Sequence, residues 1–481
     1  MAIQRPATMK RSLAVLFSLS ALLLQSCGGG SGSPADPPGA ASGPGSVGVT
    51  AVAKDSRVTL AWPMEPGVEY WVFRQRGPGA SPEKCQVENQ TQEFPCETYV
   101  NVRSPFTATA VKTFMINDDL YSFSINGRRD GGPGGPGSVP VEATPRIAGN
   151  IWTTGNSGTT NDLRGIAYGT YVDVSDGTVV ADGRTTIDRN GFLYFENEIV
   201  PNGIPFQSSI YIAVGANGTL LRSLDGKAWR PINSPTNDAM NAVTYNALLA
   251  RFVAVGANGV IWMSPDGITW SVSSSGTPVE LNSVTTDNLG QFVAVGASGT
   301  ILFSSDGSNW VRSDSGTLNT LYSVMDATNI LGLGYIAVGA SGTMLYSTDG
   351  INWQTIASGV TASTLRSVTG GIVIAGTTLT PLLLAVGDNG TILASLDGQN
   401  WVSQQSPSTA QLNAVAYGRQ FIIGGNDGSI YTSLDGFNWA PTTTRYTNSP
   451  IYNISVGGIF SSIFAYDYAA VGAGGLSMLA E

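Results

Sequence analysis

Short apolar segments separated by turn residues recur along the last two thirds of the chain. One recurring phrase is YIAVGANGT at 211–219, which returns as FVAVGANGV at 252–260. Each copy follows a phrase such as LNAV at 412–415 and precedes, with one exception, a segment of the form Ser-x-Asp-Gly-x-x-Trp. Apolar runs bounded by Gly, Asn and Asp predict β-strands joined by tight turns. Each unit therefore predicts four strands, the fourth of which begins at the Trp.

The number and spacing of these units predict the architecture. Units of four strands that repeat about every 40 residues are typical of a β-propeller. The chain has seven copies of each of the first two phrases, and the last copy, at 468–476, lacks a Ser-x-Asp-Gly segment after it. NIWTTGNS at 150–157 has the character of the fourth strand that the last unit lacks, with Trp152 in the Trp position. We expect this early strand to complete the last blade, because closing the ring hides both sheet edges. The predicted fold is all-β, with a seven-bladed propeller over 145–481.

A smaller β domain is predicted over 47–144. SRVTLAW at 56–62 and LYSFSING at 120–127 alternate apolar and polar residues, as half-buried strands do. This region resembles a fibronectin type III domain. The resemblance implies a β-sandwich in which Trp62 is buried and Tyr121 lies near the tyrosine corner. Such a domain usually serves as a spacer, and a binding role is the alternative.

The N-terminus has the pattern of an export signal. Basic residues precede an apolar run at 13–24, which is too short for a confident membrane span, so we expect a signal peptide over 1–26. Leu24-Gln25-Ser26-Cys27 resembles the lipobox of bacterial lipoproteins. That resemblance implies cleavage before Cys27, lipid on its thiol and, because Gly28 replaces Asp, an outer-membrane location in the cell envelope. The alternative is an ordinary secreted protein. Residues 27–46 would then be the lipidated Cys and a flexible Gly/Ser/Pro tether.

The chain has two other cysteines, Cys85 and Cys96. Outside the cytoplasm we expect them to form a disulfide across a short loop. The alternative is a reactive thiol pair, for which neither a CxxC spacing nor a histidine is available.

Charge and composition exclude several functions. The chain contains no histidine, which removes the commonest general base and the commonest metal ligand. Its net charge is −10, and the first 26 residues hold three of the 24 basic residues and no acid, so the processed chain would carry −13. Such a balance repels phosphate backbones, and nucleic acid is therefore not an expected partner. We also expect no cofactor and no metal.

The repeated Ser-x-Asp-Gly-x-x-Trp resembles the Asp-box of the sialidase/BNR-like repeat superfamily. Its Asp can accept hydrogen bonds from turn N–H groups, its Gly can supply the backbone angle, and its Trp can pack on a neighbouring strand. Six copies predict a structural staple, because a catalytic residue is needed once per site. The resemblance implies that these turns lie on the face opposite an active site. The residues are Asp225, Asp266, Asp306, Asp349, Asp397 and Asp435 with Trp229, Trp270, Trp310, Trp353, Trp401 and Trp439.

Catalysis is not expected. Sialidases require an arginine triad, a Tyr/Glu nucleophilic pair and an Asp acid, and TPRIAGN at 144–150 is only a faint echo of their first arginine motif. One alternative function is a sialidase-like or other polysaccharide-acting glycoside hydrolase, which needs two carboxylates facing one pocket. The other is a purely structural component of the envelope, which predicts no ligand pocket at the channel mouth. The propeller also resembles the photosystem II assembly factor family, which implies a non-catalytic scaffold. The arginine-rich patch of that family is not evident here, so a photosynthetic role is not implied.

A candidate ligand site follows from the position of the inner strands. Their second residues should form a ring at the mouth of the central channel, where Arg, Asn and Tyr suit the recognition of glycans or peptide backbones. The alternative is that these side chains only satisfy polar groups of the inner strands. Arg164 and Arg366 break the Asn pattern and are the stronger candidates. The ring consists of Arg164, Asn241, Asn282, Tyr322, Arg366, Asn413 and Tyr452.

These observations predict a cell-envelope lipoprotein whose propeller is a non-catalytic binding or assembly platform. Its expected partners are the membrane, through Cys27, and a glycan or cell-surface protein. The insertion at 170–208 could add partner contacts. Its acids do not meet the EF-hand spacing, so a solvated hairpin is favoured over a calcium site. The acids in question are Asp173, Asp176, Asp182 and Asp188.

Overall fold

The structure of the chain is a computed structural model. It describes residues 40–41, 48–54, 57–82, 85, 96–102, 104, 106–108, 117–130, 132–172, 185–187, 193–195, 198–200, 207–332, 334–356, 360–375, 378–442, 447–458 and 466–480. The predicted signal peptide and Cys27 lie outside these residues, as do Asp173, Asp176, Asp182 and Asp188. Within the stretch predicted as a tether, β1 (Ala40–Ala41) pairs with Arg128 and Gly127.

Seven four-stranded antiparallel sheets form the propeller. The strands of each sheet follow one another in the chain, except in the last blade, whose fourth strand comes from before the first blade. From the first blade to the seventh, the strands are β10 (Leu163–Val172), β14 (Gln207–Gly215), β15 (Leu220–Ser223) and β16 (Arg230–Pro231); β17 (Met240–Asn246), β18 (Arg251–Gly256), β19 (Ile261–Ser264) and β20 (Ser271–Ser273); β21 (Leu281–Thr286), β22 (Phe292–Gly296), β23 (Ile301–Ser304) and β24 (Val311–Ser313); β25 (Leu321–Asp326), β26 (Tyr335–Gly339), β27 (Met344–Ser347) and β28 (Gln354–Thr355); β29 (Leu365–Ala375), β30 (Thr378–Gly387), β31 (Ile392–Ser395) and β32 (Val402–Ser403); β33 (Leu412–Tyr417), β34 (Phe421–Gly425), β35 (Ile430–Ser433) and β36 (Ala440–Pro441); and β37 (Ile451–Gly458), β38 (Tyr466–Gly472), β39 (Ser477–Ala480) and β9 (Thr153–Thr154).

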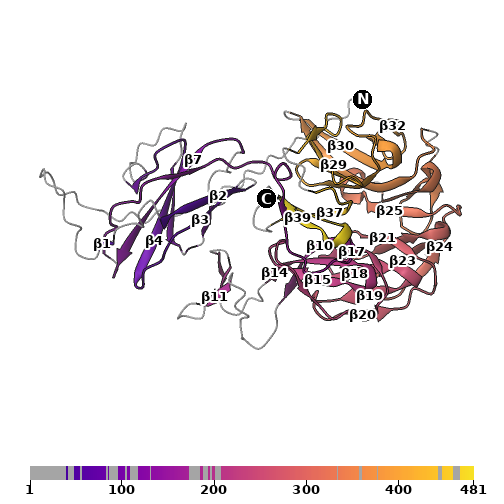
Figure 1. Ribbon diagram of the computed structural model, residues 1–481, viewed down its shortest axis with the longest axis horizontal. Helices are drawn as coiled ribbons and strands as arrows, with labels where there is room; N and C mark the ends of the chain where they lie inside the picture. Colours follow the sequence, from indigo (N-terminus) through magenta and orange to yellow (C-terminus); the bar gives the residue numbers. More distant parts are fainter. Residues whose placement is uncertain are drawn as a thin grey trace, which may run out of the picture.

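The early strand closes the ring, as the sequence predicts. Thr153 and Thr154 of β9 pair with Leu479 and Met478 of β39. The inner strands β10 and β37, from the first and last blades, also lie in contact, and Figure 1 shows the yellow end of the chain beside the magenta β10. Trp152 is fully buried and donates from Nε1 to the carbonyl of Gly149 at 2.7 Å. Closure therefore leaves neither the first nor the last blade with an uncovered sheet face.

The second strand of each blade carries the densest core. In FVAVG at 292–296 every residue is buried, because neighbouring blades cover both faces of the sheet. Apolar clusters accordingly join residues of adjacent blades; one contains Val253 of β18 and Phe292 of β22. The terminal Gly is required by a close approach, since a Cβ atom on Gly296 would lie 2.1 Å from the backbone oxygen of Glu280.

In all six Asp-box turns the Asp carboxylate accepts from two backbone N–H groups and from the Ser hydroxyl, whereas the indole donates to the Gly carbonyl only from Trp310, Trp353 and Trp401. In the fourth blade, Oδ1 of Asp349 accepts from the N–H groups of Ile351 and Asn352 at 2.9 and 2.8 Å and from the hydroxyl of Ser347 at 3.0 Å. Gly350 lies at φ +73°, which favours glycine. The Trp353 indole donates to the Gly350 carbonyl at 3.0 Å. The predicted acceptor role of the Asp and the conformational role of the Gly are confirmed, and the Ser has a role that the sequence did not suggest.

The blade-closing strand carries a degenerate Asp-box. RIAGNIW at 146–152 aligns with SLDGFNW at 433–439, so Ala148 stands where the other blades have Asp. Gly149 keeps a positive φ, +107°, and the indole-to-carbonyl bond of Trp152 matches that of Trp353. The faint sialidase echo in this segment is therefore part of a structural turn.

Ahead of the propeller, two sheets pack around one apolar core. One contains β2 (Thr50–Lys54), β3 (Arg57–Ala61) and β6 (Phe106–Ala108), and the other contains β1, β4 (Val68–Arg76), β5 (Cys96–Val102), β7 (Tyr121–Arg129) and β8 (Val141–Ala143). Trp62 and Tyr121 are buried in that core, and the Trp62 ring meets Tyr70 edge-on at 5.7 Å. Cys85 is disulfide-bonded. Its pairing with Cys96, the fibronectin type III resemblance and the domain boundaries stay predictions.

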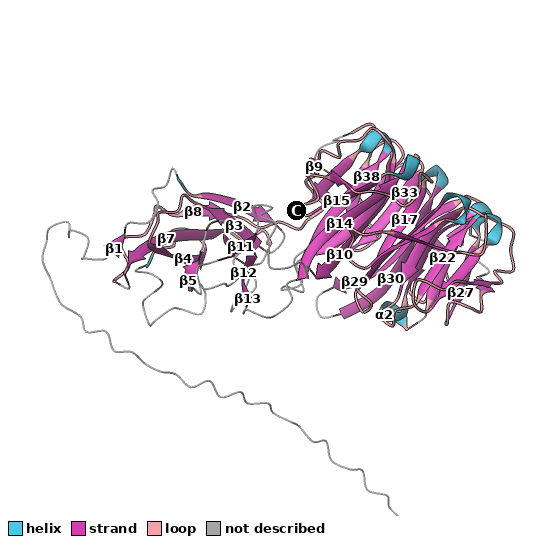
Figure 2. Ribbon diagram, turned by 90° about the horizontal axis from the view of Figure 1, so that it is seen from below, coloured by secondary structure: helices cyan, strands magenta, loops and turns pink. Residues whose placement is uncertain are grey.

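The propeller has two unlike faces. At one end of the blades lie the links between blades and the turns between second and third strands, which are short 3₁₀ helices in six of the seven blades. These helices are η2 (Ala216–Gly218), η3 (Ala257–Gly259), η4 (Ala297–Gly299), η5 (Ala340–Gly342), η6 (Asp388–Gly390) and η7 (Ala473–Gly475). At the other end lie the Asp-boxes, the hairpins between first and second strands and the short helix α2 (Thr328–Leu331). Figure 2 shows the 3₁₀ helices along one edge and α2 at the opposite edge.

The insertion in the first blade forms a small sheet of its own. It contains β11 (Thr185–Ile187), β12 (Leu193–Phe195) and β13 (Glu198–Val200), and it extends the hairpin between β10 and β14 on the Asp-box face.

Removing one Asp-box carboxylate should destabilise the protein in a pH-dependent way. Backbone N–H and side-chain hydrogen bonds outweigh burial and lower the pKa of Asp349 to about 2. Because that pKa is below the unfolded value, the stabilisation is present above about pH 4 and is lost as the pH falls toward 2. We expect Asp349→Ala to lower the free energy of unfolding by about 1–3 kcal/mol at pH 7. Urea titrations at pH 7, 4 and 2.5 should show this difference shrinking with the pH.

Asp349→Asn is the matched control for this substitution. It keeps one acceptor oxygen but cannot ionise, so its smaller loss of stability should be measured against the same wild-type titrations. A difference between wild type and Asp349→Ala that stays constant from pH 7 to 2.5 would contradict the assigned role of the charge.

Candidate functional site

A β-bulge stands at the start of every inner strand. In the third blade Leu281 pairs with Gly296 and Ser283 with Val295, so Asn282 between them has no cross-strand partner. The same register shift occurs in all seven blades, and the bulged residues are Arg164, Asn241, Asn282, Tyr322, Arg366, Asn413 and Tyr452. Bulges re-aim a side chain, and here they direct one from each blade toward the channel.

All seven predicted residues line one hollow at the channel mouth. The hollow has a volume of about 350 Å³ and is also lined by Asp162 and Gln411. It lies at the end of the blades that carries the 3₁₀ helices, because each bulge adjoins the Gly that ends the second strand, and in six blades that Gly precedes one of these helices. The structure thus brings together every residue of the predicted ring. Whether these residues bind a ligand stays a prediction.

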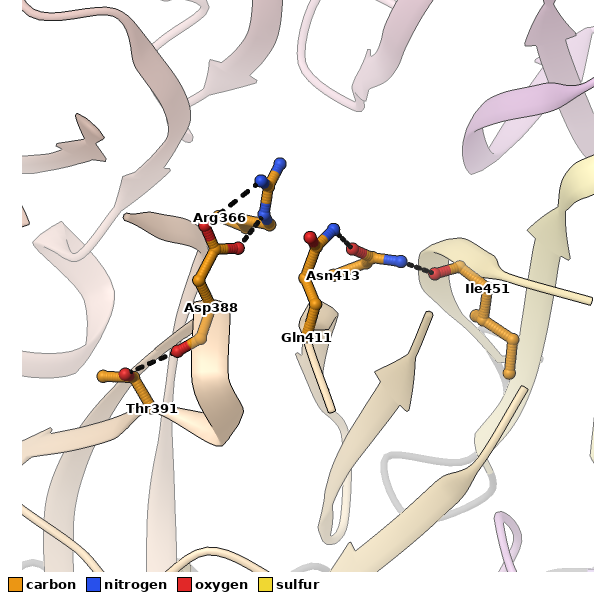
Figure 3. A network of polar contacts seen from close by, with 6 residues as sticks. All are labelled: Arg366, Asp388, Thr391, Gln411, Asn413 and Ile451. Carbon is orange, nitrogen blue, oxygen red and sulfur yellow. Dashed lines mark hydrogen bonds and ion pairs between the residues drawn. The ribbon is translucent and has the colours of Figure 1, made fainter. Parts of the chain in front are cut away.

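Arg366 is held rigidly on one side of the hollow. Its Nε donates to Oδ1 of Asp388 at 2.5 Å, and its Nη2 donates to Oδ2 at 3.3 Å. Its guanidinium also lies 5.4 Å from the centre of the Tyr322 ring. Figure 3 shows Asp388 turned toward Arg366 from the turn below it. The guanidinium charge is therefore already matched by a carboxylate of the same blade.

Arg164 has a different environment. Its Nη1 donates to Oδ1 of Asn241 at 2.9 Å, and Nδ2 of Asn241 donates in turn to Glu280 at 3.0 Å. Within the described part of the chain, Arg164 forms no ion pair within 4.0 Å. The direct partner of Arg164 is therefore the neutral amide of Asn241. The carboxylate of Glu280 bonds to that amide and not to Arg164 itself.

The asparagines of the ring connect neighbouring blades. Nδ2 of each donates to the backbone carbonyl of the first residue in the next inner strand, and the bonds run from Asn241 to Leu281, Asn282 to Leu321 and Asn413 to Ile451 at 2.8–2.9 Å. The side-chain amides of Gln411 and Asn413 also lie in hydrogen-bond contact at 2.6 Å, as Figure 3 shows. For these three residues the alternative reading, a structural polar role, is supported by direct contacts.

Tyr452 and Asp162 lie beside Arg164. Burial and the negative charge of Asp162 raise the pKa of Tyr452, while Arg164 lowers it. Asp162 lines the hollow; its Oδ1 accepts from the N–H of Gly474 at 2.9 Å, and its Oδ2 has no partner among the described residues. This side of the hollow thus offers a carboxylate oxygen, a phenol and a guanidinium together.

Carboxylates near the mouth are mostly engaged. Of the nine residues that line the hollow, Asp162 alone is acidic, while Asp388 is bonded to Arg366 and Glu280 to Asn241. A glycosidase needs one carboxyl group to donate a proton and a second to act as a base or nucleophile. Only one carboxylate of the three faces the hollow directly.

The described residues contain neither a candidate metal site nor a candidate membrane-spanning helix. Among these, no group of three or more His, Cys, Asp or Glu could hold a metal ion. Nor does the described part contain a helix long and apolar enough to cross a bilayer.

Sequence reasoning missed three residues at this site. Asp162 and Gln411 each lie close in sequence to a bulged residue, and Asp388 replaces the Ala that begins most of the 3₁₀ helices. A departure from the repeat marks Asp388, since five of the other six blades have Ala there: Ala216, Ala257, Ala297, Ala340 and Ala473.

Comparison with known proteins adds little to this geometry. No family model matches the chain, and no curated protein matches it. Solved structures that resemble it include YCF48 bound to D1 peptide, with 18% identity and a TM-score of 0.47 over 69% of this chain and 94% of that one. Another is the WD40 β-propeller domain of Doa1, with 12% identity and a TM-score of 0.46 over 68% of this chain and 95% of that one. The propeller assignment rests on the strand topology of this chain.

Removing an asparagine that connects two blades should cost stability. In Asn413→Ala the Ile451 carbonyl loses its donor, and we expect the free energy of unfolding to fall by about 1–2 kcal/mol. Tyr322→Phe is the control, since no protein group among the described residues bonds its hydroxyl. Urea unfolding of the two variants should separate them, and equal stabilities would argue against the connecting role.

Proposed function

We propose that this protein is a non-catalytic binding platform of the cell envelope, with its ligand site in the hollow at the channel mouth. The observation that carries the proposal is the convergence of nine polar side chains from all parts of the ring on one cavity. Four of the seven bulged residues are Arg or Tyr instead of the Asn that connects blades. These four depart from the structural pattern at the point where a ligand would bind.

The path of the chain supports a platform that presents this hollow outward. β9 runs antiparallel to β39, so the residues before Thr153 enter the propeller at its Asp-box face. Ala148 is also bonded there, because the Gln420 side chain of a first hairpin donates to its carbonyl at 2.7 Å. The sandwich, the predicted tether and the proposed lipid on Cys27 therefore all connect to the face opposite the mouth. An anchored molecule would direct its hollow away from the point of attachment.

The partner we propose is a glycan or a cell-surface protein that inserts a polar group into the hollow. The lining residues supply amide, hydroxyl and guanidinium groups, which form directional hydrogen bonds with either kind of partner. Catalysis is not proposed, because a single acid faces the hollow and no histidine exists in the chain to assist it.

Site-specific photocrosslinking in cells would test which face binds. A benzophenone side chain at Leu318, an exposed residue in the link beside the mouth, should form crosslinked adducts with the partner. These adducts should disappear when Arg164→Ala is introduced into the same protein. The same group at Phe437, exposed on the Asp-box face, should capture nothing that depends on Arg164. Arg312→Ala removes an exposed arginine on β24 and is the matched control. Adducts that do not depend on Arg164 would contradict the proposed site.

The proposed anchor can be tested separately. Full-length protein should partition into the detergent phase of a Triton X-114 extraction, and Cys27→Ser should move it to the aqueous phase. Wild-type protein that stays aqueous would contradict lipidation without bearing on the hollow.

A further inference from the structure

From the charges and hydrogen bonds of the hollow we infer that its ligand is a neutral, hydroxyl-rich glycan, and that Asp388 sets this specificity by neutralising Arg366. The inference rests on the proposed function and names the ligand class of the same site. It distinguishes this hollow from one built around arginines to hold an acidic sugar.

The charge balance disfavours an anionic ligand. Arg164 and Arg366 are the two cations of the hollow, while Asp162, Asp388 and Glu280 lie in it or bond directly to its lining residues. A ligand carboxylate would therefore enter a region with no net positive charge. The carboxylate would also lose its hydration without gaining an electrostatic attraction that offsets this cost.

Arg366 in particular is poorly available to an anion. Both oxygens of Asp388 engage its guanidinium, in the two-point arrangement that a ligand carboxylate would otherwise adopt. Tyr322 lies against the same guanidinium and limits its movement. A ligand carboxylate would have to displace Asp388. Because Asp388 belongs to the same blade as Arg366, its contact with the guanidinium costs no translational or rotational entropy of association.

The groups left open suit hydroxyls. In the described part of the chain, no protein group bonds the Tyr322 or Tyr452 hydroxyl, Oδ1 of Asn282 or Oδ2 of Asp162. Together with the unused N–H groups of Arg164 these atoms include donors, acceptors and groups that do both. A sugar hydroxyl donates and accepts, so it can use all of them, whereas a carboxylate could only accept and would face Asp162. The volume of about 350 Å³ is sufficient for one or two sugar rings.

The position of Asp388 makes it a clean specificity residue. It begins η6, where five other blades have Ala, and the fold-maintaining bonds of this turn run through its backbone: its N–H donates to Thr364 and its carbonyl accepts from Thr391. Asp388→Ala therefore introduces the residue that five other blades have and leaves these bonds in place. The change exposes the Arg366 guanidinium to the hollow.

The test is a glycan array probed with full-length protein in detergent. It should carry neutral hexose oligomers, the same oligomers ending in a uronate or a sialic acid, and the same oligomers ending in an amino sugar. We expect wild type to bind neutral oligomers, Arg164→Ala to lose at least tenfold in affinity and Arg312→Ala to match wild type. In Asp388→Ala the ratio of acidic to neutral affinity should rise at least tenfold. Circular dichroism and thermal unfolding would verify that each variant is folded.

Other outcomes separate this inference from the proposed function. Wild-type preference for acidic or amino-sugar oligomers, or an unchanged ratio in folded Asp388→Ala, would overturn the neutral-glycan inference and keep the hollow as a glycan site. A blank array combined with Arg164-dependent protein adducts at Leu318 would also overturn it, while the platform function would stand with a protein partner. Loss of both array binding and Arg164-dependent adducts would overturn the two together.

Discussion

Each blade of this propeller has two apolar faces, and both can be buried only if the sheets form a closed ring. Every residue of a second strand such as β22 is buried, and among the described residues only the neighbouring blades cover the two faces of these strands. Closure depends on two residues of β9, which pair with β39 at the other end of the propeller sequence. Trp152 secures the turn before β9 with an indole bond to Gly149. The position of every inner strand, and so of the hollow, follows from that closure.

The repeat and its exceptions have different roles. Where the sequence repeats, its residues maintain the fold: the Asp-box carboxylates bind turn N–H groups, and Asn241, Asn282 and Asn413 connect one blade to the next. Where it departs from the repeat, at Arg164, Tyr322, Arg366 and Tyr452, the side chains do not make the asparagine's bond to the next inner strand's carbonyl, and they line the hollow. Asp388 is a further departure, and its effect is to neutralise the neighbouring Arg366.

The two faces of the ring would separate the proposed anchor from the proposed ligand site. The chain enters through the Asp-box face, where the insertion of the first blade also projects, and the 3₁₀ helices surround the mouth at the other end. This division follows from the direction of β9: a closing strand from the N-terminal side must run from the Asp-box end toward the mouth to pair antiparallel with β39. The topology therefore places the channel mouth opposite the face at which the preceding residues enter the propeller.

The amino-acid sequence was enough to predict the all-β propeller, the order of strands, the closing strand and the hydrogen bonds of the Asp-box carboxylates, because these depend on short-range patterns repeated many times. It also placed seven residues at the channel mouth, since equivalent positions in a closed ring must converge. How those residues differ emerged only from their contacts in the folded chain. Asp388 reaches Arg366 from the turn that follows β30, and Asn241 couples Arg164 of the first blade to Glu280, which precedes the third. Such pairings depend on the directions in which side chains leave the bulges, and the repeat pattern of the sequence does not predict those directions.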